Sequence, residues 1–280
     1  MSKDVVVIIG IGGMGEAIAR RQGPGKKLVL ADFNEELLAR RVTELKADGF
    51  DVTSRQVDVS SRASVQALAD AAAAIGRVDQ LINTAGLSPA QAPVAAILNV
   101  DLLGVALVLD TFATVIAEGG AGVIISSMAG YMSSHLTTEE EFALATTEPE
   151  SLLALPIVGA LSDPGSAYGL AKRANQLRVR HASLAWGKRG GRINSVSPGV
   201  ISTSMGKLEL EGPSGTFMRA MIEGSGTGRI GTPSDISNVV SFLLGPDASF
   251  ITGTDLLVDG GVVASISTSP STLFAQSTAS

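Results

Sequence analysis

The chain has 280 residues, of which 45% are hydrophobic, and a formal net charge of −6. This length suits one large α/β domain or two small ones, with enough apolar residues for a substantial core. The acidic balance argues against nucleic acid as a partner, because binding to phosphates requires clustered Lys and Arg. The absence of cysteine excludes disulfides, thiolate metal sites and a cysteine nucleophile. The two histidines, His135 and His181, are far apart in sequence, so no metal site is predicted.

No segment of the sequence indicates a membrane span. The N-terminal MSKDVVVIIG has a single five-residue apolar run before its first glycine, which is too short for a signal peptide. The later stretch LLGVALVL lies between Asp101 and Asp110 and cannot cross a bilayer. We therefore expect a soluble, cytoplasmic protein without a membrane partner.

Short apolar runs alternate with amphipathic segments along most of the chain. The runs are rich in Val, Ile and Leu and are bounded by turn residues, as in strands buried on both faces of a sheet: 5–9, 28–31, 80–83, 122–126, 192–196 and 255–258. Segments between them, such as 35–48 and 64–75, have helical spacing. This alternation predicts an α/β fold, a doubly wound parallel sheet of about seven strands with helices on both faces.

A glycine motif follows the first predicted strand. Gly10, Gly12 and Gly15 form G-x-G-x-x-G at the start of a helix, where glycines allow a tight turn and close approach to a pyrophosphate. Asp32 ends the next strand, 22 residues after Gly10, which is where a carboxylate would accept hydrogen bonds from the adenosine ribose. The alternative is a glycine-rich turn with a surface aspartate. The context favours a dinucleotide site of Rossmann type.

Asp32 also bears on the choice of cofactor. A carboxylate at this position repels the 2′-phosphate of NADP, and the next residue is Phe33 rather than an arginine that could pair with that phosphate. NAD is therefore the predicted cofactor, in preference to NADP.

Further motifs follow in a fixed order: VDVS with Asp58 and Val59, LINTAG with Asn83 to Gly86, IISSMAG with Ser126 and Ser127, Y-x-x-x-K at Tyr168 and Lys172, NSVSPGVIST at 194–203, and FITGTDLLVDGG from Phe250. As an ordered set they resemble the short-chain dehydrogenase/reductase family in its single-domain branch. The resemblance covers residues 4 to about 264. It implies one nucleotide-binding domain over 1–264.

The resemblance also implies a catalytic set. Tyr168 would exchange a proton with the substrate oxygen, and Lys172, four residues later on the same helix face, would lower the pKa of that phenol. Ser127 would orient the reacting oxygen. Taken by itself, the Tyr168–Lys172 spacing fits any two residues on one helix face. The implied cofactor-binding residues are Gly10, Gly12, Gly13, Met14, Gly15, Asp32, Phe33, Asp58, Val59, Asn83, Thr84, Ala85, Gly86, Tyr168, Lys172, Pro198, Gly199, Ile201 and Thr203.

Two departures from the family pattern concern the site itself. Ile9 stands where the family usually has threonine, and the glycine turn is one residue shorter. Asp101, in VDLLG, takes the place of an asparagine that kinks a helix and holds a water linked to the lysine. An ionised Asp101 would raise the pKa of Lys172. We include Asp101 in the catalytic set, the alternative being an ordinary helix residue.

A third departure is the length of the segment before Tyr168. Residues 131–163 form an acidic insertion in which Pro149 and Pro156, with Pro164 directly after it, would interrupt any helix. Some carbonyl reductases and 3α-hydroxysteroid dehydrogenases of the family carry an insertion there. We predict a helical flap beside the active site that changes one helix–helix interface, rather than a solvated loop. Residues 204–224 are predicted as a substrate lid rather than a surface helix pair, and 265–280 as a flexible tail. The predicted apolar lining of the lid is Met205, Leu208, Leu210, Phe217, Met218 and Met221.

The predicted function is NAD-dependent interconversion of a secondary alcohol and a ketone, including bulky apolar carbonyls such as steroids. An NAD-binding sensor without turnover is the alternative from another class. A sugar-nucleotide epimerase would also use Y-x-x-x-K, but those enzymes carry a larger C-terminal substrate domain. The resemblance implies a homotetramer or homodimer, and the partner is a small-molecule alcohol or ketone.

Overall fold

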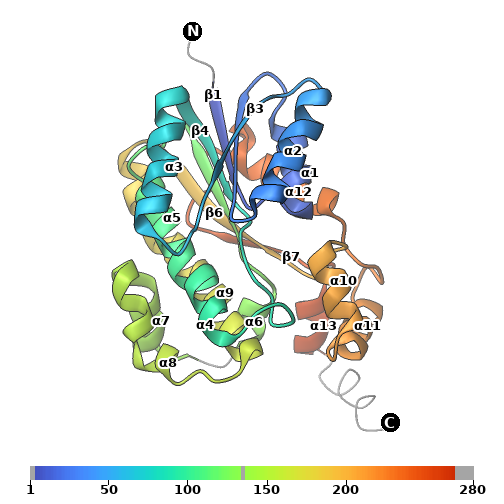
Figure 1. The fold of residues 1–280 in the computed structure, drawn as a ribbon. Coiled ribbons are helices and arrows are strands. Elements are labelled where there is room, and N and C mark those ends of the chain that lie inside the picture. The colour runs from blue at the N-terminus through green and yellow to red at the C-terminus, as the bar shows by residue number, and fades with distance from the viewer. Residues whose placement is uncertain (1–3, 134–135, 269–280) are drawn as a thin grey trace.

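The computed structural model describes residues 4–133 and 136–268; His135 and the part of the predicted tail from 269 onward lie outside the described residues (Figure 1). Seven parallel strands form one sheet in the order β3-β2-β1-β4-β5-β6-β7. Their bounds are β1 Asp4–Ile9, β2 Lys27–Asp32, β3 Asp51–Gln56, β4 Arg77–Asn83, β5 Ala121–Ile125, β6 Arg192–Pro198 and β7 Asp255–Val258. The predicted doubly wound α/β fold is confirmed.

Helices cover both faces of the sheet (Figure 1). They are α1 Gly13–Gln22, α2 Glu35–Ala47, α3 Arg62–Ile75, α4 Val94–Ile97, α5 Val105–Phe112, α6 Ala129–Met132, α7 Thr138–Thr146, α8 Pro156–Gly159, α9 Pro164–Lys188, α10 Ser204–Glu211, α11 Gly215–Glu223, α12 Pro233–Leu244 and α13 Val262–Thr268. A π-helical segment, η1 (Leu98–Gly104), joins α4 to α5, and two 3-10 helices lie at Pro149–Ala154 and Pro246–Ala248.

The central strand shows why these residues form a buried sheet. In β1, Val5, Val7 and Ile9 pack into one core cluster with residues of α3, α5 and α9. The alternate residues Val6 and Ile8 pack into the other cluster with residues of α1 and α12. Because successive side chains of a strand point to opposite faces, an unbroken apolar run is what a strand between two helical layers requires.

The strand order reverses at β1, and this places the site. The chain proceeds from β1 outward to β2 and β3, then returns to β4 on the other side of β1. In open parallel sheets the connections leave in opposite directions at such a point and open a crevice at the carboxyl ends of the strands. The glycine turn after Ile9 and the turn after Asn83 both begin there.

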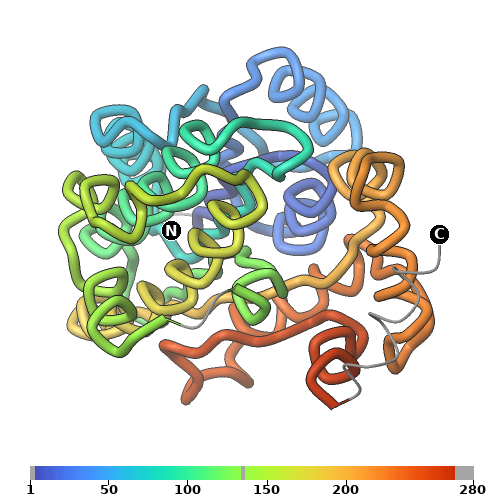
Figure 2. Tube along the Cα trace, turned by 90° about the horizontal axis from the view of Figure 1, so that it is seen from below, coloured from blue at the N-terminus to red at the C-terminus, as the bar shows by residue number. Residues whose placement is uncertain are grey.

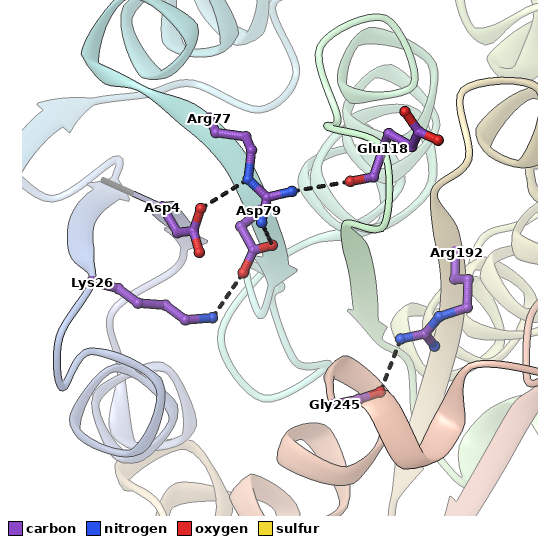
Figure 3. A network of polar contacts seen from close by, with 7 residues as sticks. All are labelled: Asp4, Lys26, Arg77, Asp79, Glu118, Arg192 and Gly245. Carbon is purple, nitrogen blue, oxygen red and sulfur yellow. Dashed lines mark hydrogen bonds and ion pairs between the residues drawn. The ribbon is translucent and has the colours of Figure 1, made fainter. Parts of the chain in front are cut away.

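Polar contacts connect residues at the opposite end of the sheet, where the strands begin (Figure 3). Arg77, the first residue of β4, donates to Asp4 at 2.8 Å, to Asp79 at 2.7 Å and to the Glu118 carbonyl at 3.0 Å. Lys26 pairs with Asp79 at 2.8 Å. These contacts are partly exposed to solvent and lie at the other end of the strands from the crevice. Their role is therefore to hold neighbouring strand ends together locally.

One continuous helical stretch, Val94–Phe112, is long and apolar enough to cross a membrane by length and composition, and 61% of it is buried inside the protein. It packs against α9 and α3. Its apolarity is that of a helix in a protein core.

The insertion and the lid lie on opposite sides of the carboxyl-end crevice (Figures 1 and 2). The three prolines of this region begin helices rather than only interrupting them. Each occupies the first turn of a helix: Pro149 and Pro156 within the insertion, and Pro164 directly after it. The C-terminal helix α13 reaches Thr268, four residues past the predicted domain boundary at 264.

Candidate active site

The glycine turn closes against the turn after β4. Gly10 has φ +85°, and a Cβ there would lie 2.6 Å from the Ala85 nitrogen. A Cβ on Gly15 would lie 2.0 Å from the Gly10 carbonyl oxygen. The Thr84 hydroxyl donates to that oxygen at 2.7 Å. Side chains at Gly10 and Gly15 would therefore clash with the protein itself, so glycine at both positions lets the two turns pack closely.

Asp32 holds the glycine turn to the end of β2. Its Oδ2 accepts from the Ile11 amide at 2.8 Å and its Oδ1 from the Asn34 amide at 2.9 Å. The neighbouring Phe33 side chain is 70% exposed. Asp58 lies one strand further out, in the turn after β3, where its Oδ1 accepts from the Ser60 amide at 2.9 Å.

These features fit a dinucleotide. The N-cap of α1 is Gly12, which makes no side-chain capping bond, and the space beside its Cα is open. Amide groups of the first helical turn therefore face that space, as anion binding requires. Asp32 would lie on the adenosine side of such a ligand. The residues that would hold the phosphates are Gly12, Gly13 and Met14.

A cavity of about 590 Å³ opens beside the glycine turn. Met14, at the start of α1, and Thr203 line it, as do Ser127 and Tyr168. A Cβ on Gly13 would be 3.1 Å from Thr203 Cγ2, so the start of the lid directly faces the turn. The other lining residues that bear on the prediction are Leu136, Ile157 and Leu161 of the insertion, Met205, Phe217, Met218 and Met221 of the lid, and Pro198, Gly199 and Ile201.

Tyr168, Lys172 and Ser127 are brought together as predicted. The Lys172 Nζ lies 5.3 Å from the centre of the Tyr168 ring, and Tyr168 and Ser127 share the cavity wall. The buried Ser126 hydroxyl donates to the Lys172 carbonyl at 2.8 Å and so fixes α9 to the end of β5. Ser127 is left facing the cavity, where its Oγ accepts from the Ala129 amide at 3.1 Å.

Asp101 contacts Lys172 directly. Its Oδ1 lies 2.8 Å from Lys172 Nζ, its Oδ2 accepts from the Leu87 amide at 3.0 Å, and its side chain is fully buried. Asn99, in the same π-helical segment, donates to the Ala95 carbonyl at 2.7 Å and does not take this position. The direct ion pair differs from the water contact that the family pattern implies.

The pKa values of this set follow from burial and charge. Burial raises the pKa of Tyr168; Lys172 opposes it, and Asp101 raises it again, for a net upward shift. Lys172 thus acts in the predicted direction but does not outweigh burial and Asp101. Burial lowers the pKa of Lys172 itself, yet the charges of Asp101 and Tyr168 reverse this and raise it.

Sequence reasoning missed two residues that the fold brings to the site, Gln176 and Glu209, and one that binds the insertion, Arg178. Gln176 donates to the Ser197 hydroxyl at 3.0 Å and reaches the Ser127 carbonyl at 3.5 Å. Arg178 donates to two carbonyls of the insertion, Leu144 at 3.0 Å and Thr147 at 2.8 Å. Glu209 lines the cavity from α10. For Gln176 and Glu209, helical spacing was the sequence signal that could have identified them. Gln176 lies one turn after Lys172, and Glu209 lies one turn after Met205.

The lid contributes less apolar lining than its sequence suggested. We expected Leu208 and Leu210 to line the cavity with the three methionines and Phe217 of this segment. Leu208 is 51% exposed instead, and Leu210 does not line the cavity but packs behind the lining residues Val200 and Met218. Both leucines differ from the prediction because α10 is rotated so that Met205 and Glu209 line the cavity in their place.

Comparisons with known proteins agree with this geometry. The family described as short chain dehydrogenase matches residues 3–138, and that described as enoyl-(acyl carrier protein) reductase matches 132–263. The chain is 42% identical to a short-chain dehydrogenase/reductase (bsc3) of Alternaria brassicicola, over 95% of this chain and 98% of that protein. It is 31% identical to a 3-alpha-hydroxysteroid dehydrogenase/carbonyl reductase of Comamonas testosteroni, over 76% and 85% of the two chains.

Among solved structures, levodione reductase superposes with a TM-score of 0.75 at 28% identity, over 93% of this chain and 98% of that one. The matching sequence spans nearly the whole described fold, including the crevice, the Tyr–Lys pair and the insertion. On this basis, the chain belongs to the short-chain dehydrogenase/reductase family of oxidoreductases, whose fold binds a nicotinamide dinucleotide.

Proposed function

We propose that this protein is an NAD-dependent oxidoreductase that interconverts a secondary alcohol and a ketone. The observation that carries the proposal is the position of Tyr168 and Ser127 in the wall of one cavity that Met14 of the glycine turn also lines, with Lys172 Nζ 5.3 Å from the centre of the tyrosine ring. Two hydroxyl groups facing the same space can bind and protonate one oxygen atom. The bound nicotinamide would supply the hydride acceptor or donor.

Tyr168 has the role of general acid/base. Its phenol exchanges a proton with the substrate oxygen, and the Lys172 ammonium stabilises the phenolate form. Ser127 donates to the same oxygen and fixes its orientation. Asp101 keeps Lys172 charged and positioned through the 2.8 Å contact. The lysine therefore needs no further partner on its buried side.

The preference for NAD over NADP rests on Asp32. Both of its oxygens accept from backbone amides, and no salt bridge involves it within the described part of the chain. An uncompensated carboxylate at the adenosine end repels a 2′-phosphate.

The test combines turnover with cofactor binding. NADH formation is measured with a panel of secondary alcohols, and NAD binding by calorimetry, for the wild type and Tyr168→Phe. We expect turnover by the wild type, a loss of about 100-fold or more in the variant, and unchanged NAD binding. Binding without turnover across the panel would instead identify an NAD sensor, and undiminished turnover by Tyr168→Phe would overturn the role of the tyrosine.

We further propose that the insertion shapes both the substrate cavity and the oligomer. Leu136, Ile157 and Leu161 line the cavity, while α7 packs against α9. A groove between α5 and α9 is lined by apolar residues, among them Leu109 and the 69% exposed Leu184, and by the charged or titratable residues Asp110, Arg178, His181 and Lys188. Such a mixed apolar and polar helix face suits a homodimer or homotetramer. Light scattering on the purified protein decides the oligomeric state.

A further inference from the structure

The substrate cavity has an unbalanced charge. Two of its described lining residues carry carboxyl groups, Asp163 and Glu209, and none of them is Lys, Arg or His. The other lining side chains are mostly apolar, with several methionines among them. A carboxylate in such surroundings is costly unless a cation or hydrogen-bond donor faces it. The described lining therefore supplies no positive group to these acids, and a bound substrate can supply one.

Glu209 is the more enclosed of the two acids. It lies on α10 one turn after Met205, and both residues line the cavity while being only partly exposed. Burial raises the pKa of its carboxyl, and the nearby Ser88 hydroxyl lowers it. That hydroxyl is completely buried and makes no well-formed hydrogen bond within the described residues. Glu209 thus has no cationic partner in the cavity and at most a weak contact with one neutral hydroxyl.

The charge of Glu209 also reaches the proposed chemistry. The Glu209 carboxylate is close enough to Tyr168 to contribute to the rise in the pKa of that phenol. The acid and the tyrosine therefore face the same space from different elements, the lid helix α10 and helix α9. A substrate whose oxygen lies on Tyr168 can place a second group against Glu209.

Asp163 adds negative charge from another side. It caps α9, where its Oδ2 accepts from the Ser166 amide at 2.7 Å and from the Ser166 hydroxyl at 3.0 Å. These bonds lower the pKa of its carboxyl. Its side chain is exposed at the end of the insertion, so it adds a solvated negative charge at the cavity wall rather than a binding contact.

We propose that the cavity selects its substrate by charge, for an apolar alcohol or ketone that carries a protonated amine away from the reacting carbon, with Glu209 as the residue that binds the ammonium group. The ammonium offsets the buried carboxylate, and carboxylated or phosphorylated substrates are repelled. This inference rests on the proposed function.

The test uses three alcohols with one ring skeleton: 4-aminocyclohexanol, 4-methylcyclohexanol and 4-hydroxycyclohexanecarboxylate. Their kcat/KM values with NAD are compared for the wild type, Glu209→Gln and Glu211→Gln. Glu211 is the matched control, because it lies on the same helix but is exposed and does not line the cavity. The unit of comparison is the ratio of amine to methyl compound, which cancels general losses of activity.

We expect a wild-type ratio of about tenfold or more, with the carboxylate the poorest substrate. Glu209→Gln lowers the ratio to near unity, and Glu211→Gln leaves it unchanged. A wild-type ratio near unity, or an undiminished ratio in Glu209→Gln, overturns the inference while leaving the proposed function intact.

If none of the three alcohols is oxidised, a binding measurement tests the charge selection without relying on turnover. The NADH-loaded protein is titrated calorimetrically with cyclohexylammonium and with cyclohexanol. Ammonium binding that is about tenfold tighter, and is lost in Glu209→Gln, supports charge selection. Equal or undetectable affinity for the two probes overturns it.

Discussion

The Asp101 carboxylate lies 2.8 Å from the Lys172 ammonium, and both side chains are almost completely excluded from solvent. Lys172 in turn lies behind Tyr168. The positive charge of Lys172, which should lower the pKa of the Tyr168 phenol, is therefore partly offset. The Asp101 carboxylate lies beside the ammonium, and the two opposite charges oppose each other in their effect on the phenol. The π-helical turn of η1 and the bond from the Leu87 amide hold the carboxylate in place.

Asp101→Asn is expected to shift the pH dependence of alcohol oxidation. Asp101 raises the pKa of Tyr168, so its removal lowers that pKa, and the phenolate forms at lower pH. The rise of kcat/KM with pH should move downward by about one unit. Asn99→Asp, in the same segment but bonded to Ala95, is the control and should leave the profile in place. A shift in the opposite direction would mean that Lys172 loses its proton when Asp101 is gone.

Gly86→Ala should disturb the same pair without changing any charge. A Cβ at Gly86 would lie 2.6 Å from Asp101 Oδ1 and 3.2 Å from Lys172 Nζ. Because buried side chains have little room to move, we expect kcat to fall by about tenfold or more while the fold is kept. Gly187→Ala, where nothing lies within 4 Å, is the matched control. Activity at the wild-type level in Gly86→Ala would show that the ion pair can shift without consequence.

Asp32→Asn should weaken the discrimination against NADP. The substitution removes the carboxylate charge at the adenosine end, and the ratio of kcat/KM for NADP to that for NAD should rise by about tenfold. It also weakens the bonds to the Ile11 and Asn34 amides, so activity with NAD falls as well. Asp51→Asn, at the other end of the sheet, leaves the ratio unchanged. An unaltered ratio in Asp32→Asn would place the discrimination elsewhere.

Arg178→Met should loosen the insertion locally. Burial lowers the pKa of this arginine to about 10, and its bonds to the Leu144 and Thr147 carbonyls offset that cost. Without them two carbonyls at the end of α7 lose their donor, a local loss of about 2–3 kcal/mol. Amide hydrogen exchange over 138–154 should accelerate, whereas Arg180→Met, at an exposed position of the same helix, should not change it. Equal exchange in both variants would contradict this role of Arg178.

The sequence predicted the architecture well because its signals are local. An unbroken apolar run such as 5–9 requires a strand with helices on both sides, and the structure buries alternate residues of β1 in two clusters. The glycine turn depends on a positive φ at Gly10, a conformation that few other residues adopt. The pairing of Tyr168 with Lys172 follows from helix periodicity. Each of these predictions needed only neighbours in the chain or a repeated spacing.

Contacts between distant segments could not be predicted in this way. The sequence identified Asp101 as a replacement for an amide, but not that its oxygen meets Lys172 directly; that depends on the π-helical phase of η1 against α9. It marked residues 204–224 as a lid but not that Glu209, rather than Leu208, faces the cavity. Local sequence thus determined the strands, the turn and the types of residue in the candidate catalytic set. Tertiary packing decided the charge around them, because electrostatic energies depend on distances and burial that are set only when separate helices pack together.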